Sequence, residues 1–326
     1  MKLFWRVLLA LLVVLLVWFG YFWVSNWRAF KRFETLVHTM QKKHVPFVLK
    51  TSVQAKKLKM RDHSIHYFVS GHGKETLLML HPAYGDHQSF ERQLDFFSKH
   101  YKIITVDLLG HGRSQVRKTG ADISWTSRHL KRILALEKVN KAHVIGVSLG
   151  SLLAQHFALR FPEKVQSLTV VGGYRISGNN EEILQRQQRE IARWLLMMAT
   201  MPLKVMKSQL AQMTCYHKRA QIRFYELQKP WDRDLFSLMK GFGEIIKKRP
   251  SATMKHPTLL VVGEHDLAIT KKANRQWKKQ FPKTRLLFLK NSGHCANMDT
   301  PKLFNQSLLR FLQDTTAPKG KKTKAE

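Results

Sequence analysis

Hydrophobic and polar positions follow three successive patterns along the chain. From Val7 to Val24 the sequence has 18 residues without a charge, enough for a helix that crosses most of a bilayer core. From about Leu58, short aliphatic and β-branched runs alternate with segments in which apolar residues recur every three to four positions. From Ser177 to about His256 only the helical spacing remains. The pattern predicts an apolar helix followed by a strand–helix domain that a helical segment interrupts.

The strand–helix region has the composition of a parallel sheet. Its strand-like runs are TLLML, YKIITV, AHVIGV, SLTVV, TLLVVG and RLLFL, and KMRDHSIHYFVSG alternates like a hairpin. The helical segments between them include TSRHLKRILAL, LLAQHFALRF, KKANRQWKKQF and LFNQSLLRFLQD. Because strands and helices alternate, we expect a mainly parallel sheet with helices on both faces.

These changes of pattern predict five segments. They are a transmembrane anchor over residues 1–25, a basic connector over 26–57, a core over 58–176 and 257–314, a helical cap over 177–256, and a Lys-rich disordered tail over 315–326. A helical insertion at the C-terminal end of a parallel sheet is where a lid over an active site would lie.

The apolar N-terminal run fits an uncleaved anchor better than a cleaved signal peptide. No small-x-small cleavage site follows it, and the aromatic residues at its end suit a membrane interface. Lys2 and Arg6 precede the run, whereas more Lys and Arg residues follow it, so the flanking charge favours a cytoplasmic domain on a single-pass protein. An export signal would place the domain outside, and the side of the membrane stays open.

Composition adds a strong positive charge. Lys and Arg number 56 against 22 Asp and Glu, for a net charge of +34. The basic residues are spread over the chain without a nucleic-acid-binding motif, so we expect attraction to anionic lipid and no nucleic-acid partner. Cys215 and Cys295 are the only cysteines and form no metal-binding spacing. His63 and His66 fit the face of a strand better than a metal site, and we expect no metal or cofactor.

The stretch GVSLG places Ser148 between a predicted strand and a predicted helix. A serine nucleophile needs a base and oxyanion donors, and in G-x-S-x-G it occupies a tight strand-to-helix turn. Gly146 and Gly150 leave room for the neighbouring backbones there. A chance turn of small residues is the alternative, and the residues that follow later strands argue against it.

Asp266 and His294 follow two later strands, in the motifs GEHD and SGHCANMD. The order Ser, Asp, His suits a histidine base that a carboxylate orients. Glu264 is the competing carboxylate, and we expect its side chain to point elsewhere. We therefore predict Ser148 as the nucleophile, His294 as the base and Asp266 as the orienting acid.

An oxyanion hole requires two backbone N–H groups. Leu149, directly after the serine, is predicted to supply one. Ala83, in the motif HPAYG, is predicted to supply the other, because Pro82 has no N–H. Tyr84 is a candidate for the acyl side of the site, although a surface position is equally compatible with the sequence.

With these motifs the chain resembles the α/β-hydrolase superfamily over about residues 58–314. The motifs are HPAYG, DLLGHGRS, GVSLG, GEHD and SGHCANMDTP. The resemblance implies a mostly parallel eight-stranded sheet, a helical cap between strands six and seven, and the catalytic roles given above. Pro82 and Ser151 depart from residues that are common in the family. The anchor followed by this domain is similar in organisation to membrane-bound monoacylglycerol lipases.

The sequence therefore predicts a membrane-anchored serine hydrolase for carboxylic esters, with membrane lipids and small apolar acyl esters as its partners. No obligate protein partner follows from the sequence. Trp194 and Met198 of the apolar cap are candidate substrate-binding residues. Two alternatives stay open: another acyl or C–C hydrolase on the same triad, such as a thioesterase or lactonase, and a ligand-sensing protein with a vestigial triad.

Overall fold

The structure is a computed structural model of the 326-residue chain. It describes residues 2–43, 47–116, 119–178, 200–232, 241–246 and 255–316, together with positions 185, 189 and 235.

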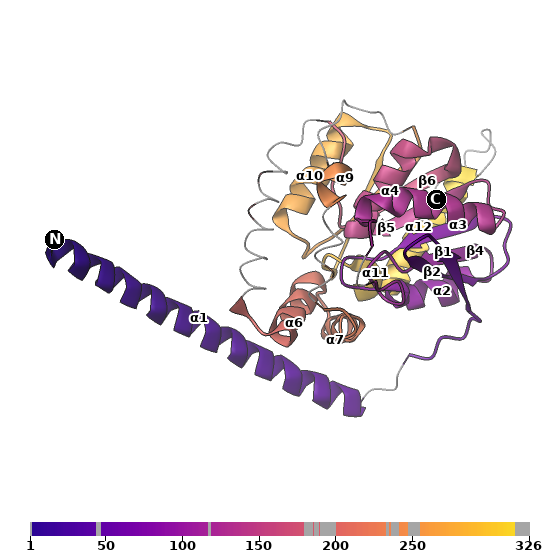
Figure 1. The fold of residues 1–326 in the computed structure, drawn as a ribbon. Helices are drawn as coiled ribbons and strands as arrows, with labels where there is room; N and C mark the ends of the chain where they lie inside the picture. The colour runs from indigo at the N-terminus through magenta and orange to yellow at the C-terminus, as the bar shows by residue number, and fades with distance from the viewer. Residues whose placement is uncertain are drawn as a thin grey trace.

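An eight-stranded sheet forms the centre of the molecule, with the strand order β1-β2-β4-β3-β5-β6-β7-β8 (Figure 1). The strands are β1 Gln54–Lys59, β2 Ser64–Ser70, β3 Thr76–Leu80, β4 Lys102–Val106, β5 Ala142–Val147, β6 Val165–Val171, β7 Thr258–Gly263 and β8 Arg285–Leu289. β2 pairs antiparallel with β1 and β4, and the pairs from β4 to β8 are parallel. The predicted hairpin and mostly parallel sheet are confirmed.

Helices cover both faces of the sheet because its central strands are apolar on both sides. In β3, Leu78 and Leu80 pack into one core, whereas Leu77 and Met79 pack into the other. Residues of α3 Thr126–Leu136, α4 Leu149–Arg160 and α10 Ala268–Gln280 complete the first core. Residues of α2 Glu91–Phe97 and α12 Pro301–Thr316 complete the second. Side chains therefore alternate between two cores along each central strand.

The helical cap lies between β6 and β7, at the position that the sequence predicts. Its described helices are α6 Leu203–Thr214, α7 Lys218–Leu227 and α9 Phe242–Ile246. Phe224 of α7 packs into the second core, while α9 contacts α4. The cap is thus fastened to the core at two separate places. Trp194 and Met198, the predicted substrate-binding residues of the cap, lie outside the described residues.

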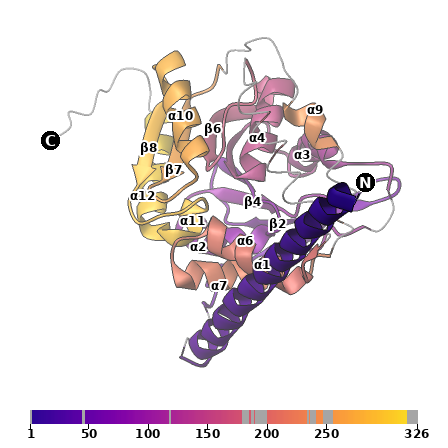
Figure 2. The same ribbon diagram turned by 90° about the vertical axis from the view of Figure 1, so that its left-hand side faces the viewer.

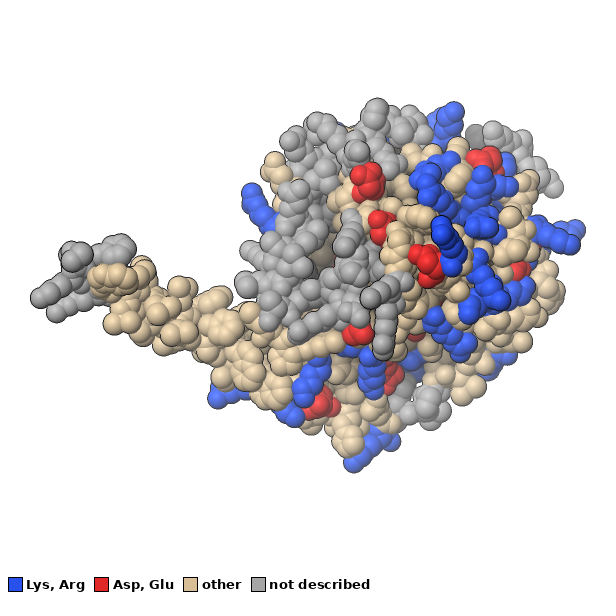
Figure 3. All heavy atoms as spheres, viewed as in Figure 1, with Lys and Arg blue, Asp and Glu red and all other residues tan. Residues whose placement is uncertain are grey.

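The N-terminal helix α1 runs from Lys2 to Lys43 without a break, through the predicted anchor and into the predicted connector. Its apolar segment is exposed and projects from the domain, and Figure 3 shows no charge on its described projecting part. Its second half lies beside α6, where Phe30 and Phe33 are buried (Figures 1 and 2). By length and composition α1 could cross a membrane, although signal sequences and core helices pass the same test.

Close backbone packing fixes the junction of β5 and α4. A Cβ on Gly150 would lie 2.1 Å from the carbonyl oxygen of Leu80, and one on Gly146 would lie 2.2 Å from that of Gly150. Real Cβ atoms do not approach backbone this closely, so neither position has room for a side chain. The two glycines let α4 start directly against β3 and β5.

We expect Gly150→Ala to destabilise the protein by about 3 kcal/mol or more, because backbone on both sides must move. The midpoint of thermal unfolding should fall by about 6 °C or more. Gly243→Ala is the matched control, since a Cβ there has no neighbour within 4 Å. Equal midpoints for the two variants would contradict this account of the junction.

Candidate active site

Ser148 occupies the sharp turn between β5 and α4. Its backbone has φ 51° and ψ −117°, a conformation that is strained for a residue with a side chain. Its N–H donates to the carbonyl of Val171 at 2.8 Å. Its carbonyl accepts bonds from the N–H of Ser151 at 2.9 Å and from the Ser151 hydroxyl at 2.6 Å. The unexpected serine at position 151 therefore helps to hold the turn.

His294 and Asp266 meet Ser148 from loops at the ends of two other strands. His294 Nε2 lies 2.8 Å from Ser148 Oγ, and His294 Nδ1 lies 2.8 Å from Asp266 Oδ1. Asp266 Oδ1 also accepts a bond from the N–H of Leu267 at 2.7 Å, which fixes the carboxylate. Glu264 is exposed and accepts from the N–H of Asn291 instead. The structure thus brings together the three residues that the sequence singles out.

The environment of His294 makes it a stronger base than a free histidine. Burial alone would lower the pKa of His294, but the charge of Asp266 and its hydrogen bond raise the pKa above its ordinary value. The Asp266 carboxylate holds the Nδ1 proton, so the neutral imidazole presents an unprotonated Nε2 to Ser148. This is the protonation state that a general base requires.

Two backbone N–H groups are candidates to stabilise an oxyanion. Leu149 is the first residue of α4, where N–H groups have no partner within the helix. Within the described part of the chain, neither the Leu149 N–H nor the Ala83 N–H donates a hydrogen bond to the protein. Both predicted donors are therefore unoccupied, as an oxyanion hole requires.

A buried histidine that the sequence analysis left unassigned holds the loop of Ala83. His81 Nδ1 donates to the carbonyl of Pro82 at 2.7 Å, and His81 Nε2 accepts from the N–H of Leu108 at 3.0 Å. Burial lowers the pKa of His81 to about 4, so the ring is neutral and can accept at Nε2. The signal that could have found it is its place at the start of HPAYG.

The neighbouring loop is fixed by a second unassigned residue, Asp107. Its buried carboxylate accepts bonds from the N–H and Nδ1 of His87 and from the N–H of Arg113, each at 2.8 Å. Gly112 lies against this carboxylate with φ +50°. Hydrogen bonds therefore join the loop of DLLGHGRS to the loop that begins with HPAYG.

Tyr84 joins the oxyanion loop to the cap. It has φ 66°, and its ring packs against Trp231 with the centroids 4.7 Å apart. Met206 and Leu210 of α6 belong to the same apolar cluster. Tyr84 is half-buried against the cap, and its role on the acyl side of the site stays a prediction. The described residues contain no group of three or more His, Cys, Asp or Glu side chains that could hold a metal ion.

Two family models match the chain. One is described as the alpha/beta hydrolase fold and matches residues 75–212, and the other is described as TAP-like protein and matches residues 244–324. Together they cover the segment that carries Ser148 and the segment that carries Asp266 and His294.

Proteins that are similar in sequence or in structure include a hydrolase and an esterase. A 2-hydroxy-6-oxononadienedioate/2-hydroxy-6-oxononatrienedioate hydrolase of Paraburkholderia phymatum is 38% identical over 114 residues, which are 33% of this chain and 40% of that protein. An esterase structure from Thermogutta terrifontis aligns with a TM-score of 0.66 at 18% identity, covering 81% of this chain and 100% of that one. A bacterial membrane phospholipase A aligns with a TM-score of 0.61 at 19% identity, covering 98% of this chain and 100% of that one.

The raised pKa of His294 predicts how the reactivity of Ser148 depends on pH. Only neutral His294 can accept the serine proton, so the reaction of Ser148 with a fluorophosphonate should speed up as the pH rises through the His294 pKa. The midpoint should lie above 6.5, the ordinary value for histidine. The rate of labelling, measured against pH, tests this.

Asp266→Asn should slow that labelling by about 10⁴-fold and move the midpoint to lower pH, because the charge that raises the His294 pKa is gone. Glu264→Gln is the control, since it neutralises the exposed carboxylate two residues away. A similar loss in both variants, or an unmoved midpoint in Asp266→Asn, would refute the assignment of Asp266 as the orienting acid.

Proposed function

This chain belongs to the α/β-hydrolase superfamily, and we propose that it is a membrane-anchored serine hydrolase that cleaves carboxylic esters of lipid origin. The observation that carries the proposal is the hydrogen-bonded triad, in which His294 lies 2.8 Å from both the Ser148 hydroxyl and the Asp266 carboxylate. The relative from Paraburkholderia phymatum is also named as a hydrolase, which supports a hydrolytic activity.

In the proposed reaction, His294 takes the proton of Ser148 as Oγ attacks the ester carbonyl. The N–H groups of Ala83 and Leu149 stabilise the negative charge on the carbonyl oxygen. When the C–O bond breaks, protonated His294 gives its proton to the leaving alcohol, and the acyl group stays on Ser148. Water then attacks the acyl-serine with His294 again as the base, which releases the acid and restores the enzyme.

The lipid part of the proposal rests on α1 and on the apolar cluster under the cap. The exposed apolar segment of α1 has the length of a membrane span, and Trp18, Tyr21 and Trp23 lie toward its end as interfacial anchors. Met206, Leu210 and Trp231 give the cap an apolar surface around Tyr84. The alignment to a membrane phospholipase A covers nearly the whole chain and supports the shared architecture.

Other scissile bonds are compatible with the same triad. The relative from Paraburkholderia phymatum is named for a dienedioate substrate, so C–C hydrolysis is the second candidate. A thioester or a lactone would also suit attack by Ser148. The substrate classes can be separated only by measured turnover.

We expect Ser148→Ala to abolish fluorophosphonate labelling and to lower ester hydrolysis by roughly 10⁶-fold, because nothing else can form the acyl intermediate. Ser52→Ala, at an exposed serine, is the control. Turnover should be compared for monoacylglycerol, acyl-thioester, lactone and vinylogous diketone substrates. Fastest turnover of a non-ester would replace the ester proposal, and no turnover of any of them would favour a binding protein.

Deletion of residues 2–24 should release the protein from membranes, since the exposed apolar surface of α1 is removed. The deletion keeps Phe30 and Phe33, which pack against the domain. We expect the deletion variant to retain hydrolysis of a water-soluble short-chain ester but to hydrolyse monoacylglycerol in vesicles at least tenfold more slowly. Retention in the membrane fraction would show that α1 is not the anchor.

A further inference from the structure

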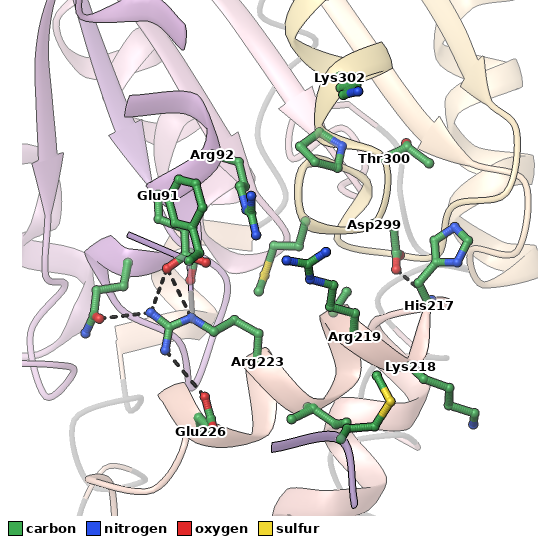
Figure 4. A pocket seen from close by; sticks show the side chains of 18 of the residues that line it. Glu91, Arg92, His217, Lys218, Arg219, Arg223, Glu226, Asp299, Thr300 and Lys302 are labelled. Atoms are coloured by element: carbon green, nitrogen blue, oxygen red, sulfur yellow. Dashed lines mark hydrogen bonds and ion pairs between the residues drawn. The ribbon is translucent and has the colours of Figure 1, made fainter. Parts of the chain in front are cut away.

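A cavity lies outside the proposed active site. It has a volume of about 980 Å³ and is bounded by α2, α7, the start of α12 and the end of α1 (Figure 4). Ser148, Asp266 and His294 do not line it. Its volume is sufficient for a small organic ligand. Since the reaction described above leaves this cavity unused, its lining requires a separate explanation.

Every carboxylate that lines this cavity already has partners. Glu91 accepts two bonds from the Arg223 guanidinium, at 2.7 Å and 3.1 Å. Glu226 accepts a bond from Gln41 and lies 3.6 Å from Arg223. Asp299 accepts bonds only from backbone N–H groups, three of them within 3.0 Å. The acidic groups of the lining therefore have other partners, and in the described part of the chain none of them forms an ion pair with Arg92 or Arg219.

Two arginines in the same cavity face each other across the seam between core and cap. Arg92 belongs to α2 of the core, Arg219 belongs to α7 of the cap, and in Figure 4 both side chains point into the cavity. Neither has a carboxylate within salt-bridge distance in the described part of the chain. Burial lowers the pKa of Arg92 and the charge of Arg219 lowers it further, while the charges of Glu91 and Asp95 raise it, so that the net shift is downward.

The guanidinium of Arg92 is held in place rather than left to move away from this repulsion. Its guanidinium carbon lies 3.7 Å from the centre of the Phe47 ring, and Phe47 belongs to the segment between α1 and β1. Two positive charges that point into one cavity repel each other, and an anion between them would replace that repulsion by attraction. This arrangement therefore points to a ligand with negative charge.

The other polar groups of the cavity suit a phosphate. Lys302 lies in the first turn of α12, a 16-residue helix whose N-terminus lines the cavity. The N–H groups of a first helical turn have no acceptor within the helix and attract anions. Guanidinium groups bind phosphate oxygens through paired hydrogen bonds. Met40, Ile222 and Met298 add apolar side chains to the lining, which suit the organic part of a phosphoester.

We propose that this cavity binds a phosphoester, with its phosphate between Arg92 and Arg219 and within reach of Lys302. The bound phosphate would replace the repulsion between α2 and α7 by attraction to both helices. It would thereby fasten the cap to the core beside the existing pair of Arg223 and Glu91. The proposal does not rest on the reaction at Ser148, and its test requires no substrate.

The test is the thermal unfolding midpoint of the full chain in a nonionic detergent at constant ionic strength. We expect sn-glycerol 3-phosphate to raise the midpoint in a saturable way, whereas chloride at equal ionic strength does not. Arg92→Gln and Arg219→Gln should each weaken the apparent affinity by about tenfold or more, since each loses a charged hydrogen bond. Without ligand, Arg219→Gln should not unfold at a lower temperature, because it removes a repulsion.

Arg310→Gln is the matched control, since it removes one positive charge from an exposed arginine of α12 outside the cavity. Its apparent affinity should stay within twofold of the parent protein. Arg219 is exposed, so Arg219→Gln tests the site even where Arg92→Gln folds poorly. Equal losses in Arg310→Gln and Arg219→Gln would overturn the proposal in favour of diffuse attraction to a basic protein.

Two further probes distinguish the sources of phosphate. Inorganic phosphate tests the anion alone, and monomeric dihexanoyl phosphatidylglycerol tests a lipid headgroup with short acyl chains. Saturation by glycerol 3-phosphate indicates a water-soluble phosphoester, and saturation by the short-chain lipid alone indicates a headgroup; both support the site. No saturable shift with any of the three probes would refute it.

Discussion

The close approach of three backbone segments at one turn governs the rest of this structure. α4 starts against β3 and β5 because Gly146 and Gly150 have no side chains, and the turn between them forces Ser148 to a positive φ. That conformation lifts the hydroxyl out of the sheet, toward the loops that follow β7 and β8. His294 can then reach it with an ordinary hydrogen bond, while the Leu149 N–H remains free of the protein. Reactivity at this position is therefore a consequence of backbone packing.

The sequence predicts the sheet and the three relay residues because each leaves a local signature. A strand is a short apolar run, and Ser148, Asp266 and His294 each follow such a run within a short motif. The roles of His81 and Asp107 were not predictable in the same way. Their hydrogen bonds join the ends of separate strands, so the partners are known only once the sheet is assembled.

The same reasoning explains what the sequence missed in the cap and the cavity. The contact of Tyr84 with Trp231 and the proximity of Arg92 to Arg219 each join residues that are far apart in the chain. Helical periodicity gives the apolar face of a cap helix but not the surface against which it packs. The basic residues after Val24 mark a change of composition, and the helix continues through them because backbone hydrogen bonding does not depend on side-chain charge.

The continuity of α1 has a mechanical meaning. Its exposed apolar segment and the segment that carries Phe30 and Phe33 belong to one rod of hydrogen-bonded turns. A sharp bend between the two segments would break helical hydrogen bonds, so the segments tilt and rotate together. Since the buried segment packs on α6, any surroundings that reorient the exposed end act as a torque on the cap. The helix thus couples the orientation of the cap to whatever environment holds the first residues of the chain.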